Sequence, residues 1–375
     1  MAEIVQKSKT RFAVTGMGIV SPLGIGKEMN WRRLCDGQSQ VRYEISSKAF
    51  VARVSGFDFD EKVRQLGMAF IAANEALTQS GLKDSDYHPQ RIGLSCGESK
   101  QNMFSKNFNL ENTFPQQLKK VLNVSGESRS SAAACATGAL NIIQGCRMIE
   151  EDVCDAVICG GAETSVHPLY IAAFRNMGAL SKQGVRPFDK NRDGFAIGEG
   201  AGFIVLEDIK KATLRGAKVY CEIAGFSNGI FSDNLLNIKS CEKMAAIIKN
   251  AVKNEVPDYV HMHGTGTKIN DLYESEAVAS VFNNAQNLSV SSTKAATGHM
   301  LGVSGMAGAV FSILAMRDNI VPPTINFKET DIKSGLNYTP CKAQKKEIMS
   351  SLSLSFGFGG QGAALYFKRY AGSSF

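Results

Sequence analysis

The residue whose surroundings point most directly to chemistry is Cys135, in the stretch SRSSAAACATGALNIIQGC at 128–146. The sequence predicts that a helix begins just after it, at about Ala136. A thiol at a helix N-terminus faces the positive end of the helix dipole and unpaired backbone N–H groups, which favour the thiolate. The small neighbours would let a substrate approach the sulfur and would leave N–H groups for an oxyanion. The alternative is an inert, buried cysteine at a tightly packed helix start.

A nucleophilic cysteine needs a histidine close to it in space, and the chain has five histidines. His88 and His167 each precede a proline, and we expect neither to take part in chemistry. His261 and His263 alternate in YVHMHGTGT at the end of a predicted strand, so both face the same side. They could belong to a metal site, but no third ligand has convincing spacing. His299 lies between a glycine and a predicted helix start, where a structural role is the alternative.

Length and composition indicate a globular protein. The 375 residues are 44% hydrophobic and 21% charged. No apolar run reaches the roughly 18 residues that span a bilayer, and the N-terminal MAEIVQKSKTRFAVTG lacks the features of a signal peptide. We therefore expect a soluble, cytoplasmic protein that does not enter a membrane. The nine cysteines are scattered, with no CxxC pair, which argues against a disulfide framework and a zinc ribbon. We expect most of them to be buried.

The formal net charge is +7, which makes the chain mildly basic. The basic residues are spread out, as in IKKATLRGAK at 209–218 and KAQKKE at 342–347, without aromatic residues between them. This pattern does not favour nucleic-acid binding. An acidic protein partner or an anionic substrate would suit the charge.

Short apolar runs alternate with helical patterns, which predicts an α/β protein with buried sheets. In 136–151, apolar residues from Ala139 to Ile149 share one face of a predicted helix. The other predicted helices are 68–82 and 298–316, and the predicted strands or hairpins are 11–20, 91–97, 155–163, 201–209, 218–227, 258–264 and 352–369. The motifs before and after residue 228 differ in kind, so we place a division there, into 1–228 and 229–375.

Six motifs occur in order along the chain: VTGMGIVSPLG (14–24), AAACATGA (132–139), RPFDKNRDGFAIGEGAG (186–202), HGTGTKINDLYE (263–274), SSTKAATGHMLGVSG (291–305) and SFGFGGQGA (355–363). Together they resemble those of the β-ketoacyl-acyl carrier protein synthases, the elongating condensing enzymes of fatty acid and polyketide synthesis. The resemblance covers nearly the whole chain, and the ordered set is far more specific than any one motif. It implies a thiolase-like fold, with two similar α/β halves stacked in α-β-α-β-α layers.

The resemblance implies a role for each matching residue. Cys135 matches the nucleophile that accepts an acyl chain from a carrier protein. His263 and His299 match the pair that binds the malonyl thioester carbonyl and supports its decarboxylation. Lys294, with Glu274, would order the site electrostatically. The implied reaction is a decarboxylative Claisen condensation of an acyl thioester with malonyl-acyl carrier protein, which gives 3-oxoacyl-acyl carrier protein.

Substrate contacts are implied in the same way. Thr265 and Thr267 match the threonines that contact the phosphopantetheine arm of the carrier protein. Phe358 matches the gating phenylalanine, and its backbone N–H would join that of Cys135 in an oxyanion hole. The other aromatic residues implied in substrate binding are Phe174 and Phe356.

The resemblance also implies partners. The acyl carrier protein delivers substrates on its phosphopantetheine, so no prosthetic group and no metal are implied. Candidate contacts to the carrier protein are Lys62, Arg64 and Arg175. The expected assembly is a homodimer, and a heterodimer with a second ketosynthase-like chain is the alternative.

Three features depart from the family pattern. The segment between Gly97 and Cys135 looks shorter than usual, which leaves the acyl-length preference open. Leu354 precedes SFGFGG where asparagine is common, so we expect the following turn to be held differently. The stretch EKVRQLGMAFI at 61–71 is less basic than the usual carrier-facing segment, so carrier contacts could lie elsewhere.

Other classes share part of this pattern. A degradative thiolase has a second active-site cysteine near the C-terminus, but no cysteine follows Cys341. The condensing enzymes that extend acyl-CoA primers pair cysteine with histidine and asparagine. A non-elongating partner of the chain-length-factor kind usually lacks the nucleophile. A dinucleotide-binding dehydrogenase is only weakly suggested by TGMGIVSPLG, whose third glycine is misplaced. The thiolase and the non-elongating partner stay as alternatives, and the pathway (fatty acid, polyene or other polyketide) stays open.

Overall fold

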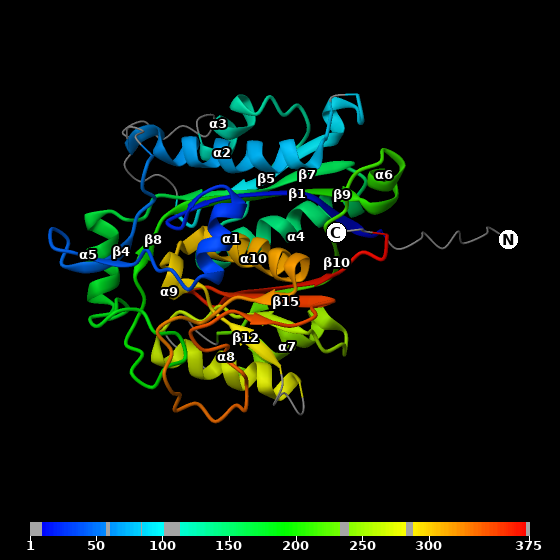
Figure 1. The fold of residues 1–375 in the computed structure, drawn as a ribbon. Helices are drawn as coiled ribbons and strands as arrows, with labels where there is room; N and C mark the ends of the chain where they lie inside the picture. The colour runs from blue at the N-terminus through cyan, green and yellow to red at the C-terminus, as the bar shows by residue number, and fades with distance from the viewer. Residues whose placement is uncertain are drawn as a thin grey trace.

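Five layers of helix and sheet make up the fold, which is seen in a computed structural model (Figure 1). The structure describes residues 10–57, 61–83, 85–100, 113–232, 240–282 and 288–372. The outer layers are α2 (Glu61–Ser80) with α3 (Phe114–Val121) on one side, and α7 (Cys241–Val252) with α8 (Lys268–Val281) on the other. Helices α4 (Thr137–Glu150) and α10 (Ser304–Asp318) lie in the middle layer, between two parts of the sheet. The layered α/β architecture is therefore the one that the resemblance implies.

One sheet of eleven strands runs through both halves of the chain, and the order of its strands repeats. The first half has the order β1 (Phe12–Ser21), β9 (Gly200–Asp208), β7 (Ala156–Glu163), β5 (Ile92–Gly97), β6 (Ser128–Arg129). The second half has the order β10 (Cys221–Ile230), β16 (Gln361–Lys368), β15 (Ser350–Phe356), β11 (Tyr259–His261), β12 (Ser289–Ser291). In each half the first three strands pair antiparallel and the last three pair parallel. The two halves are thus similar, and the antiparallel pairing of β1 with β10 joins them.

Shorter elements connect and cover these layers. The short strands are β2 (Gly24–Ile25), β3 (Arg42–Glu44), β4 (Ala49–Ala52), β8 (Ile197–Gly198), β13 (Ile320–Val321) and β14 (Gln344–Lys345). The remaining α-helices are α1 (Lys27–Cys35), α5 (Pro168–Asn176), α6 (Ile209–Leu214) and α9 (Lys294–Thr297). Three 3₁₀ turns are η1 (Pro89–Arg91), η3 (Ala134–Ala136) and η5 (Leu301–Val303). Two of these turns, η3 and η5, come directly before α4 and α10 and carry the chain into the middle layer.

The predicted strands agree well with the structure. The apolar runs at 11–20, 91–97, 155–163 and 201–209 form β1, β5, β7 and β9, and 352–369 folds as the hairpin of β15 and β16. Strand β11 ends at His261, so His263 lies in the segment after the strand. The helix predicted at 298–316 begins only at Ser304, because η5 precedes it. Residue 228, where we place the division of the chain, lies within β10.

The two helices of the middle layer contact each other at glycines. A Cβ atom on Gly138 of α4 would lie 2.8 Å from a backbone nitrogen of α10, and one on Gly305 of α10 would lie 2.9 Å from a backbone nitrogen of α4. Contacts this short are not tolerated, so the helices can come this close only because both residues lack a side chain. Since Cys135 comes just before α4 and His299 just before η5, the contact also sets the distance between these two residues.

Helix α10 is apolar along its whole length. Among the described residues, Leu301–Asp318 is the one helical stretch long and apolar enough to cross a membrane, and 89% of it is buried inside the protein. The expectation that no run reaches this length is therefore wrong for this stretch. Its place between two parts of the sheet explains the composition, because a helix surrounded by protein is apolar on all sides.

Replacing Gly305 by alanine should destabilise the protein. The new Cβ would lie 2.9 Å from the backbone of α4, so the helices would have to separate, and overpacking of this kind costs about 1–3 kcal/mol. Equilibrium unfolding in urea measures the loss. Gly229→Ala is the matched control, because its Cβ would meet its nearest atom, on Ile247, at an ordinary 3.4 Å. Equal stabilities of the two variants would contradict the packing argument.

Candidate active site

Cys135 lies in the tight turn η3 that leads into α4, and it is only 2% exposed. Ala134, directly before it, has φ +47°, a left-handed conformation that is costly for a residue with a side chain. The Thr137 hydroxyl holds the turn, because it accepts the Ala133 N–H at 2.9 Å and donates to the Ala134 carbonyl at 2.8 Å. The prediction that Cys135 sits at the start of a helix is confirmed, with α4 beginning at Thr137.

Burial dominates the ionisation of the Cys135 thiol. It raises the pKa to about 11, and this outweighs the lowering by the Phe358 N–H and by the ammonium groups of Lys294 and Lys100. The net shift is therefore opposite to the one expected for a helix start, because removing a thiolate from water costs more than the Phe358 N–H and the two ammonium groups return. Cys135 is mainly a thiol at neutral pH, so its attack on a thioester needs an acceptor for the thiol proton.

Two of the five histidines lie next to Cys135. One nitrogen of His263, one nitrogen of His299 and the Cys135 sulfur all lie within 4.8 Å of one another. The centroids of the two imidazole rings are 5.3 Å apart, with the ring planes at 79°. His263 follows β11 in the second half, whereas Cys135 precedes α4 in the first half. The site is therefore built at the junction of the two halves.

Hydrogen bonds fix the tautomer of His299. The backbone N–H of Leu301 donates to Nδ1 at 3.3 Å, and Nδ1 also lies 2.8 Å from the hydroxyl of Ser304. Since a backbone N–H only donates, Nδ1 is an acceptor and the proton of the neutral ring is on Nε2. This Nε2 is buried and has no hydrogen-bond partner among the described residues. Its N–H is therefore available to a substrate oxygen.

Both imidazoles of the site are neutral at physiological pH. Burial lowers the pKa of His263 and of His299 well below the usual range, and the ammonium of Lys294 lowers both further. Neutral N–H donors in a buried site stabilise negative charge that develops on a carbonyl oxygen. The pair is suited to hold an enolate oxygen.

The backbone of His263 is held from both sides. The Glu274 carboxylate accepts the N–H of His263 at 2.5 Å and that of Gly264 at 2.8 Å, while the Lys294 ammonium donates to the His263 carbonyl. Both charged groups are buried. Burial raises the pKa of Glu274 to about 7 and lowers that of Lys294 to about 8. Both groups contact the main chain at residues 263–264, so they position His263.

The loop at 263–267 is further fixed by Asp271, which the sequence did not single out. Its carboxylate, buried in the first turn of α8, accepts the N–H of Gly266 at 3.1 Å. The hydroxyls of Thr265 and Thr267 lie 2.9 Å apart, and Thr265 also lies 3.5 Å from the Asp271 carboxylate. The two threonines are neighbours on a loop that the carboxylate holds.

Phe174 and Phe358 lie side by side next to the histidine pair. Their ring centroids are 5.9 Å apart, and both rings pack against Phe195, at 5.3 and 6.2 Å. Phe195 meets the His299 ring edge-on at 5.0 Å. Phe174 and Phe358 are half-buried, whereas Phe195 is fully buried. The sequence found the two accessible aromatic residues and missed the buried one that joins them to His299.

Strand β15 carries two residues that the sequence singled out. Phe356 is buried in the core of the second half, where its ring packs against Phe231 at 5.2 Å. Its ring belongs to that core and not to the aromatic group beside His299. Leu354 is buried in the same core. The turn after the strand is held by a main-chain hydrogen bond, in which the Gly357 N–H donates to the Gln361 carbonyl at 2.7 Å.

The proposed carrier-protein contacts differ in their surroundings. The guanidinium of Arg64 forms an ion pair with buried Glu199 at 2.6 Å and donates to two backbone carbonyls, so Arg64 has a structural role. Arg175 is exposed on α5, where it donates to a backbone carbonyl of the turn between β3 and β4 at 2.5 Å. The side chain of Lys62 lies outside the described residues.

Two charged residues beside the site were missed by the sequence. Glu163 ends β7, Lys100 follows β5, and their side chains form an ion pair at 3.2 Å. Both affect the pKa of the Cys135 thiol, Lys100 lowering it and Glu163 raising it. The sequence did contain a signal for these two residues. CGESK and GGAE each place a charged residue at the carboxyl end of an apolar strand, and the carboxyl ends of neighbouring parallel strands lie at the same edge of a sheet.

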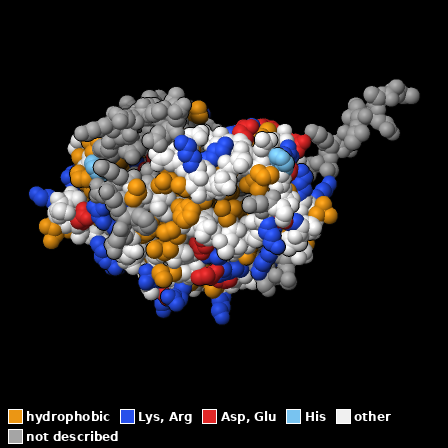
Figure 2. Space-filling model, turned by 90° about the horizontal axis from the view of Figure 1, so that it is seen from above, with side chains coloured by type: hydrophobic (Ala, Val, Ile, Leu, Met, Phe, Trp, Pro, Cys, Tyr) orange, Lys and Arg blue, Asp and Glu red, His pale blue; other side chains and the backbone are white. Residues whose placement is uncertain are grey.

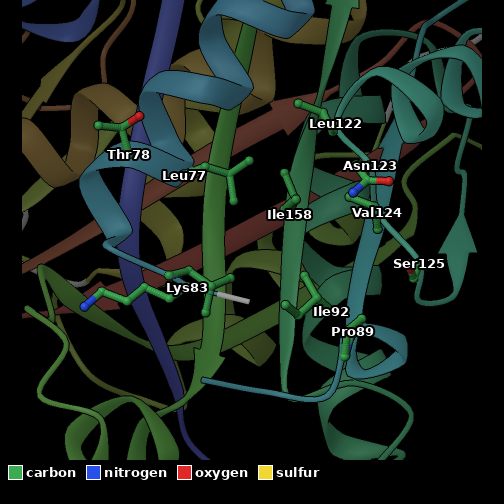
Figure 3. Close-up of a pocket in the computed structure, with 11 residues that line it drawn as sticks. Leu77, Thr78, Lys83, Pro89, Ile92, Leu122, Asn123, Val124, Ser125 and Ile158 are labelled. Carbon is green, nitrogen blue, oxygen red and sulfur yellow. The ribbon is translucent and has the colours of Figure 1, made fainter. Parts of the chain in front are cut away.

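A separate pocket of about 290 Å³ lies between the end of α2, β5 and residues 122–125 (Figure 3). Its lining is mostly apolar, with Lys83 as the charged residue among the eleven that line it. None of the predicted site residues lines this pocket. The chemistry described above therefore takes place elsewhere in the molecule.

Two kinds of chemistry suit the geometry at Cys135. One sulfur and two imidazole nitrogens this close could ligate a zinc ion. The same three groups, with neutral imidazole donors facing a thiol, could carry out acyl transfer at the thiol and stabilise an enolate. The repeated five-layer fold, with the cysteine and histidines at the junction of its halves, is that of a thiolase-like condensing protein.

The chain belongs to the β-ketoacyl synthase family. The family descriptions "Beta-ketoacyl synthase, N-terminal domain" and "Beta-ketoacyl synthase, C-terminal domain" match residues 9–212 and 212–328. A relative named 3-oxoacyl-[acyl-carrier-protein] synthase 2, from Coxiella burnetii, is 34% identical over 411 positions, which cover 96% of this chain and 99% of the relative.

Solved structures agree with this family. One is the AntDE ketosynthase, bound to a hexaketide, in complex with its type II polyketide acyl-carrier protein AntF, and another is the ishigamide ketosynthase/chain length factor. Each has a TM-score of 0.87 and 26% identity, over 97% of this chain and 100% of the other. The thiolase-like fold implied by the motifs is thus confirmed.

This chain is shorter than its Coxiella relative, because the alignment runs over 411 positions and this chain has 375 residues. The sequence places a shortening between Gly97 and Cys135. Residues 101–112 of that segment lie outside the described residues. The assignment of the shortening to this segment stays a prediction.

Limiting iodoacetamide should label Cys135 before Cys96, which is also buried, because the Phe358 N–H and two ammonium groups lower the pKa of the Cys135 thiol whereas the Glu98 carboxylate raises that of Cys96. The rate should rise about tenfold per pH unit between about pH 7 and pH 9, because a thiol with a pKa of about 11 is mainly protonated over this range. Peptide mapping measures the rates in a Cys341→Ser background, since Cys341 is exposed and would react as well. A rate at Cys135 that does not depend on pH, or earlier labelling of Cys96, would speak against the assignment.

Proposed function

We propose that the protein is a β-ketoacyl-[acyl-carrier-protein] synthase, an acyltransferase that condenses an acyl thioester with malonyl-acyl carrier protein. The products are 3-oxoacyl-acyl carrier protein and carbon dioxide. The observation that carries this proposal is the meeting of the Cys135 sulfur with nitrogens of His263 and His299 within 4.8 Å. The family of the chain and the name of its Coxiella relative support the same reaction.

The first half-reaction moves the acyl group to Cys135. The sulfur attacks the thioester carbonyl, the carbon–sulfur bond to phosphopantetheine breaks, and the departing sulfur takes up the proton of the thiol. The N–H of Phe358, which points at the Cys135 sulfur, and the N–H of Cys135 itself would hold the oxyanion. Because Cys135 is mainly protonated, proton transfer to the leaving thiolate balances this step without a separate base.

The second half-reaction uses the histidine pair. The malonyl thioester oxygen accepts hydrogen bonds from His299 Nε2–H and from His263, carbon dioxide leaves, and the electron pair of the broken bond enters the enolate. The enolate carbon then attacks the acyl-Cys135 thioester, the carbon–sulfur bond to Cys135 breaks, and the departing thiolate takes up a proton from solvent. Since both rings are neutral, they stabilise charge as hydrogen-bond donors and need not give up a proton.

Lys294 and Glu274 act on the main chain of His263 and order the site. Thr265 and Thr267 lie on the same held loop, and we assign them to the phosphopantetheine arm. Phe174 and Phe358 form the half-buried aromatic pair beside Cys135 and are assigned to the acyl chain. Phe356, which was grouped with them, packs in the core of the second half, so we give it no direct contact to substrate.

An acyl carrier protein is the expected partner, since the name of the Coxiella relative includes one and the AntDE structure contains one. Helix α5 is a suitable docking element. It exposes Arg175 and Leu169, is followed by exposed Met177, and also carries Phe174 of the aromatic pair. The net charge of +7 suits an acidic partner. Lys62 and Arg175 stay candidate contacts, whereas we assign Arg64 a structural role.

We propose that the chain forms a homodimer, with a heterodimer as the alternative, since the ishigamide structure is a ketosynthase with a chain length factor. Helices α2 and α3 expose Val63, Phe70 and Val121, at 42–48%. Figure 2, which views the molecule from above, shows hydrophobic side chains gathered near the middle of that face. Exposed apolar side chains that gather on one face are typical of an interface.

We place the protein in the cytoplasm, as a soluble enzyme that needs no prosthetic group, metal, membrane or nucleic acid. Its substrates arrive on the phosphopantetheine of the carrier protein. The non-elongating partner and the thiolase are less well supported, because the nucleophile and both histidines are present in one site. The division of the chain into an N-terminal half with Cys135 and a C-terminal half with the histidines stays a proposal, and the repeat of strand order supports a boundary at β10.

His263→Ala and His299→Ala should abolish malonyl decarboxylation and leave acyl transfer to Cys135 at least partly intact. The turn and backbone donors around the sulfur do not depend on either ring, whereas the enolate oxygen loses a donor, which costs about 10²–10³-fold in rate. Mass spectrometry of the acyl-enzyme and release of labelled carbon dioxide separate the two steps. If both variants decarboxylate normally but fail to become acylated, the assigned roles are reversed.

A further inference from the structure

Glu163 is a buried carboxylate to which the proposed reaction gives no role. It ends strand β7 and is 4% exposed. Its Oε2 accepts the backbone N–H groups of Ser99 at 3.0 Å and Gly302 at 3.2 Å. Its Oε1 accepts the Lys100 ammonium at 3.2 Å and the Ser165 hydroxyl at 2.7 Å. Four donors on one carboxylate make a rigid junction between the ends of β5 and β7 and the turn η5.

One of these donors belongs to the turn that sets the tautomer of His299. Gly302 follows Leu301, whose N–H donates to His299 Nδ1. Leu301 has φ +43°, a left-handed conformation that surrounding contacts must maintain. A Cβ on Gly302 would lie 2.7 Å from the Ser99 nitrogen and 2.8 Å from Glu163 Oε2, so the turn is pressed directly onto the carboxylate. The hydrogen bond from Gly302 to Glu163 therefore helps to hold the turn in this strained shape.

Lys100 balances the charge of this carboxylate. Its ammonium lies 4.2 Å from the centre of the Tyr170 ring and 2.8 Å from the Ser165 hydroxyl, so it is fixed on several sides. The side chain keeps 22% exposure, whereas that of Glu163 is 5% exposed. A buried carboxylate without such a partner would be costly in a site that already holds several charges.

We propose that Glu163 and Lys100 are a positioning pair for this reaction. Glu163 holds the turn after His299 so that the imidazole keeps its proton on Nε2 and aims it at the substrate. Lys100 neutralises Glu163 and is itself held by the Ser165 hydroxyl and the Tyr170 ring. The inference rests on the proposed role of His299, and it adds two residues that act through it without touching the reacting atoms.

The other charged and titratable groups around the site are already engaged. Lys294 donates to the His263 carbonyl, and Glu274 accepts the N–H groups of residues 263 and 264. The charges that act on the Cys135 thiol are those of Lys294, Lys100 and Glu163. Those that act on His299 are the ammonium groups of Lys294 and Lys100. Removing Lys100 leaves Lys294 as the remaining cation of this set.

The test replaces Glu163 by glutamine. Glutamine has nearly the same shape, but one of its two terminal atoms is an NH₂ group, which donates hydrogen bonds. In either orientation this NH₂ group would face donors, either the N–H groups of Ser99 and Gly302 or the side chains of Lys100 and Ser165. We expect kcat for malonyl decarboxylation to fall roughly 10- to 100-fold, as for a small misplacement of a catalytic group. We expect KM for malonyl-carrier protein and the extent of Cys135 acylation to stay within about twofold.

Glu207→Gln is the matched control. Glu207 is fully buried and forms an ion pair with Arg215. It lies at the opposite end of the paired strands β7 and β9 from Glu163. Glu207 pairs with Ala156, whereas Glu163 pairs with Gly200. The Glu207→Gln protein should be less stable than the wild type, without a selective loss of decarboxylation. For each variant, kcat for decarboxylation is divided by kcat for acylation. If this ratio is the same in Glu163→Gln and Glu207→Gln, the positioning role of Glu163 is overturned. A wild-type enzyme that does not decarboxylate malonyl-carrier protein would instead overturn the proposed function.

A spectroscopic readout decides the question independently of turnover. Nitrogen-15 NMR of the histidine-labelled protein should show His299 with an unprotonated Nδ1 and a protonated Nε2, and the signal is assigned by its loss in His299→Ala. In E163Q we expect this signal to move toward a mixture of the two tautomers. An unchanged tautomer in a folded E163Q overturns the proposal, whatever the activity.

Lys100→Gln tests the other member of the pair, and it is the variant to measure if E163Q fails to fold. Loss of the cation leaves Glu163 as a buried carboxylate without its ion-pair partner, so the turn after His299 should shift and kcat for malonyl decarboxylation should fall roughly 10-fold or more, as in E163Q. Lys27→Gln is the control, because Lys27 is also a half-buried partner of a carboxylate, Glu75, at 3.3 Å. Equal kcat values for decarboxylation in the two lysine variants would contradict the role of Lys100.

Discussion

The close contact between α4 and α10 is the constraint on which the rest of the site depends. Two helices can run this close together only where their facing residues have no side chain, and Gly138 and Gly305 meet this condition. Each helix belongs to a different half of a repeated fold, and each is preceded by a 3₁₀ turn: the turn before α4 carries Cys135, and His299 lies just before the turn that precedes α10. The packing of the middle layer therefore fixes where Cys135 and His299 stand relative to each other. Helix packing, and not a loop, therefore places Cys135 and His299. His263 lies on the segment after β11, which hydrogen bonds hold in place.

Burial then decides the protonation states. The same desolvation that keeps His263 and His299 neutral also keeps Cys135 as a thiol, because each charged form would lose its hydration. Neutral imidazoles are what enolate stabilisation requires, whereas a protonated thiol is a weak nucleophile. The structure compensates with the Phe358 N–H and with the ammonium groups of Lys294 and Lys100, which favour the thiolate. The surroundings of the site therefore favour the neutral imidazoles that the carbon–carbon bond-forming half-reaction needs, and they disfavour an ionised cysteine in the resting enzyme.

The sequence predicted those parts of the site that local patterns encode. Cys135 at a helix start, the strands around it and the glycine-framed His263 and His299 follow from spacing within single segments. Contacts between residues far apart in the sequence were missed. Glu163 meets Gly302 across 139 positions, and Arg64 meets Glu199 across 135, so local patterns in the sequence indicated neither contact. The direction of the Cys135 pKa shift was wrong for the same reason, because helix position is local but burial is set by the whole fold.

The central claim is that Cys135 carries the acyl group while the histidine pair carries out decarboxylation. Replacing Cys135 by alanine and supplying acyl- and malonyl-carrier protein tests it most directly, with carbon dioxide and 3-oxoacyl product measured in the same reaction. The account predicts no acyl-enzyme and no 3-oxoacyl product, but continued release of carbon dioxide, because the donors that stabilise the enolate are still present. Formation of 3-oxoacyl-carrier protein by the alanine variant would contradict the account.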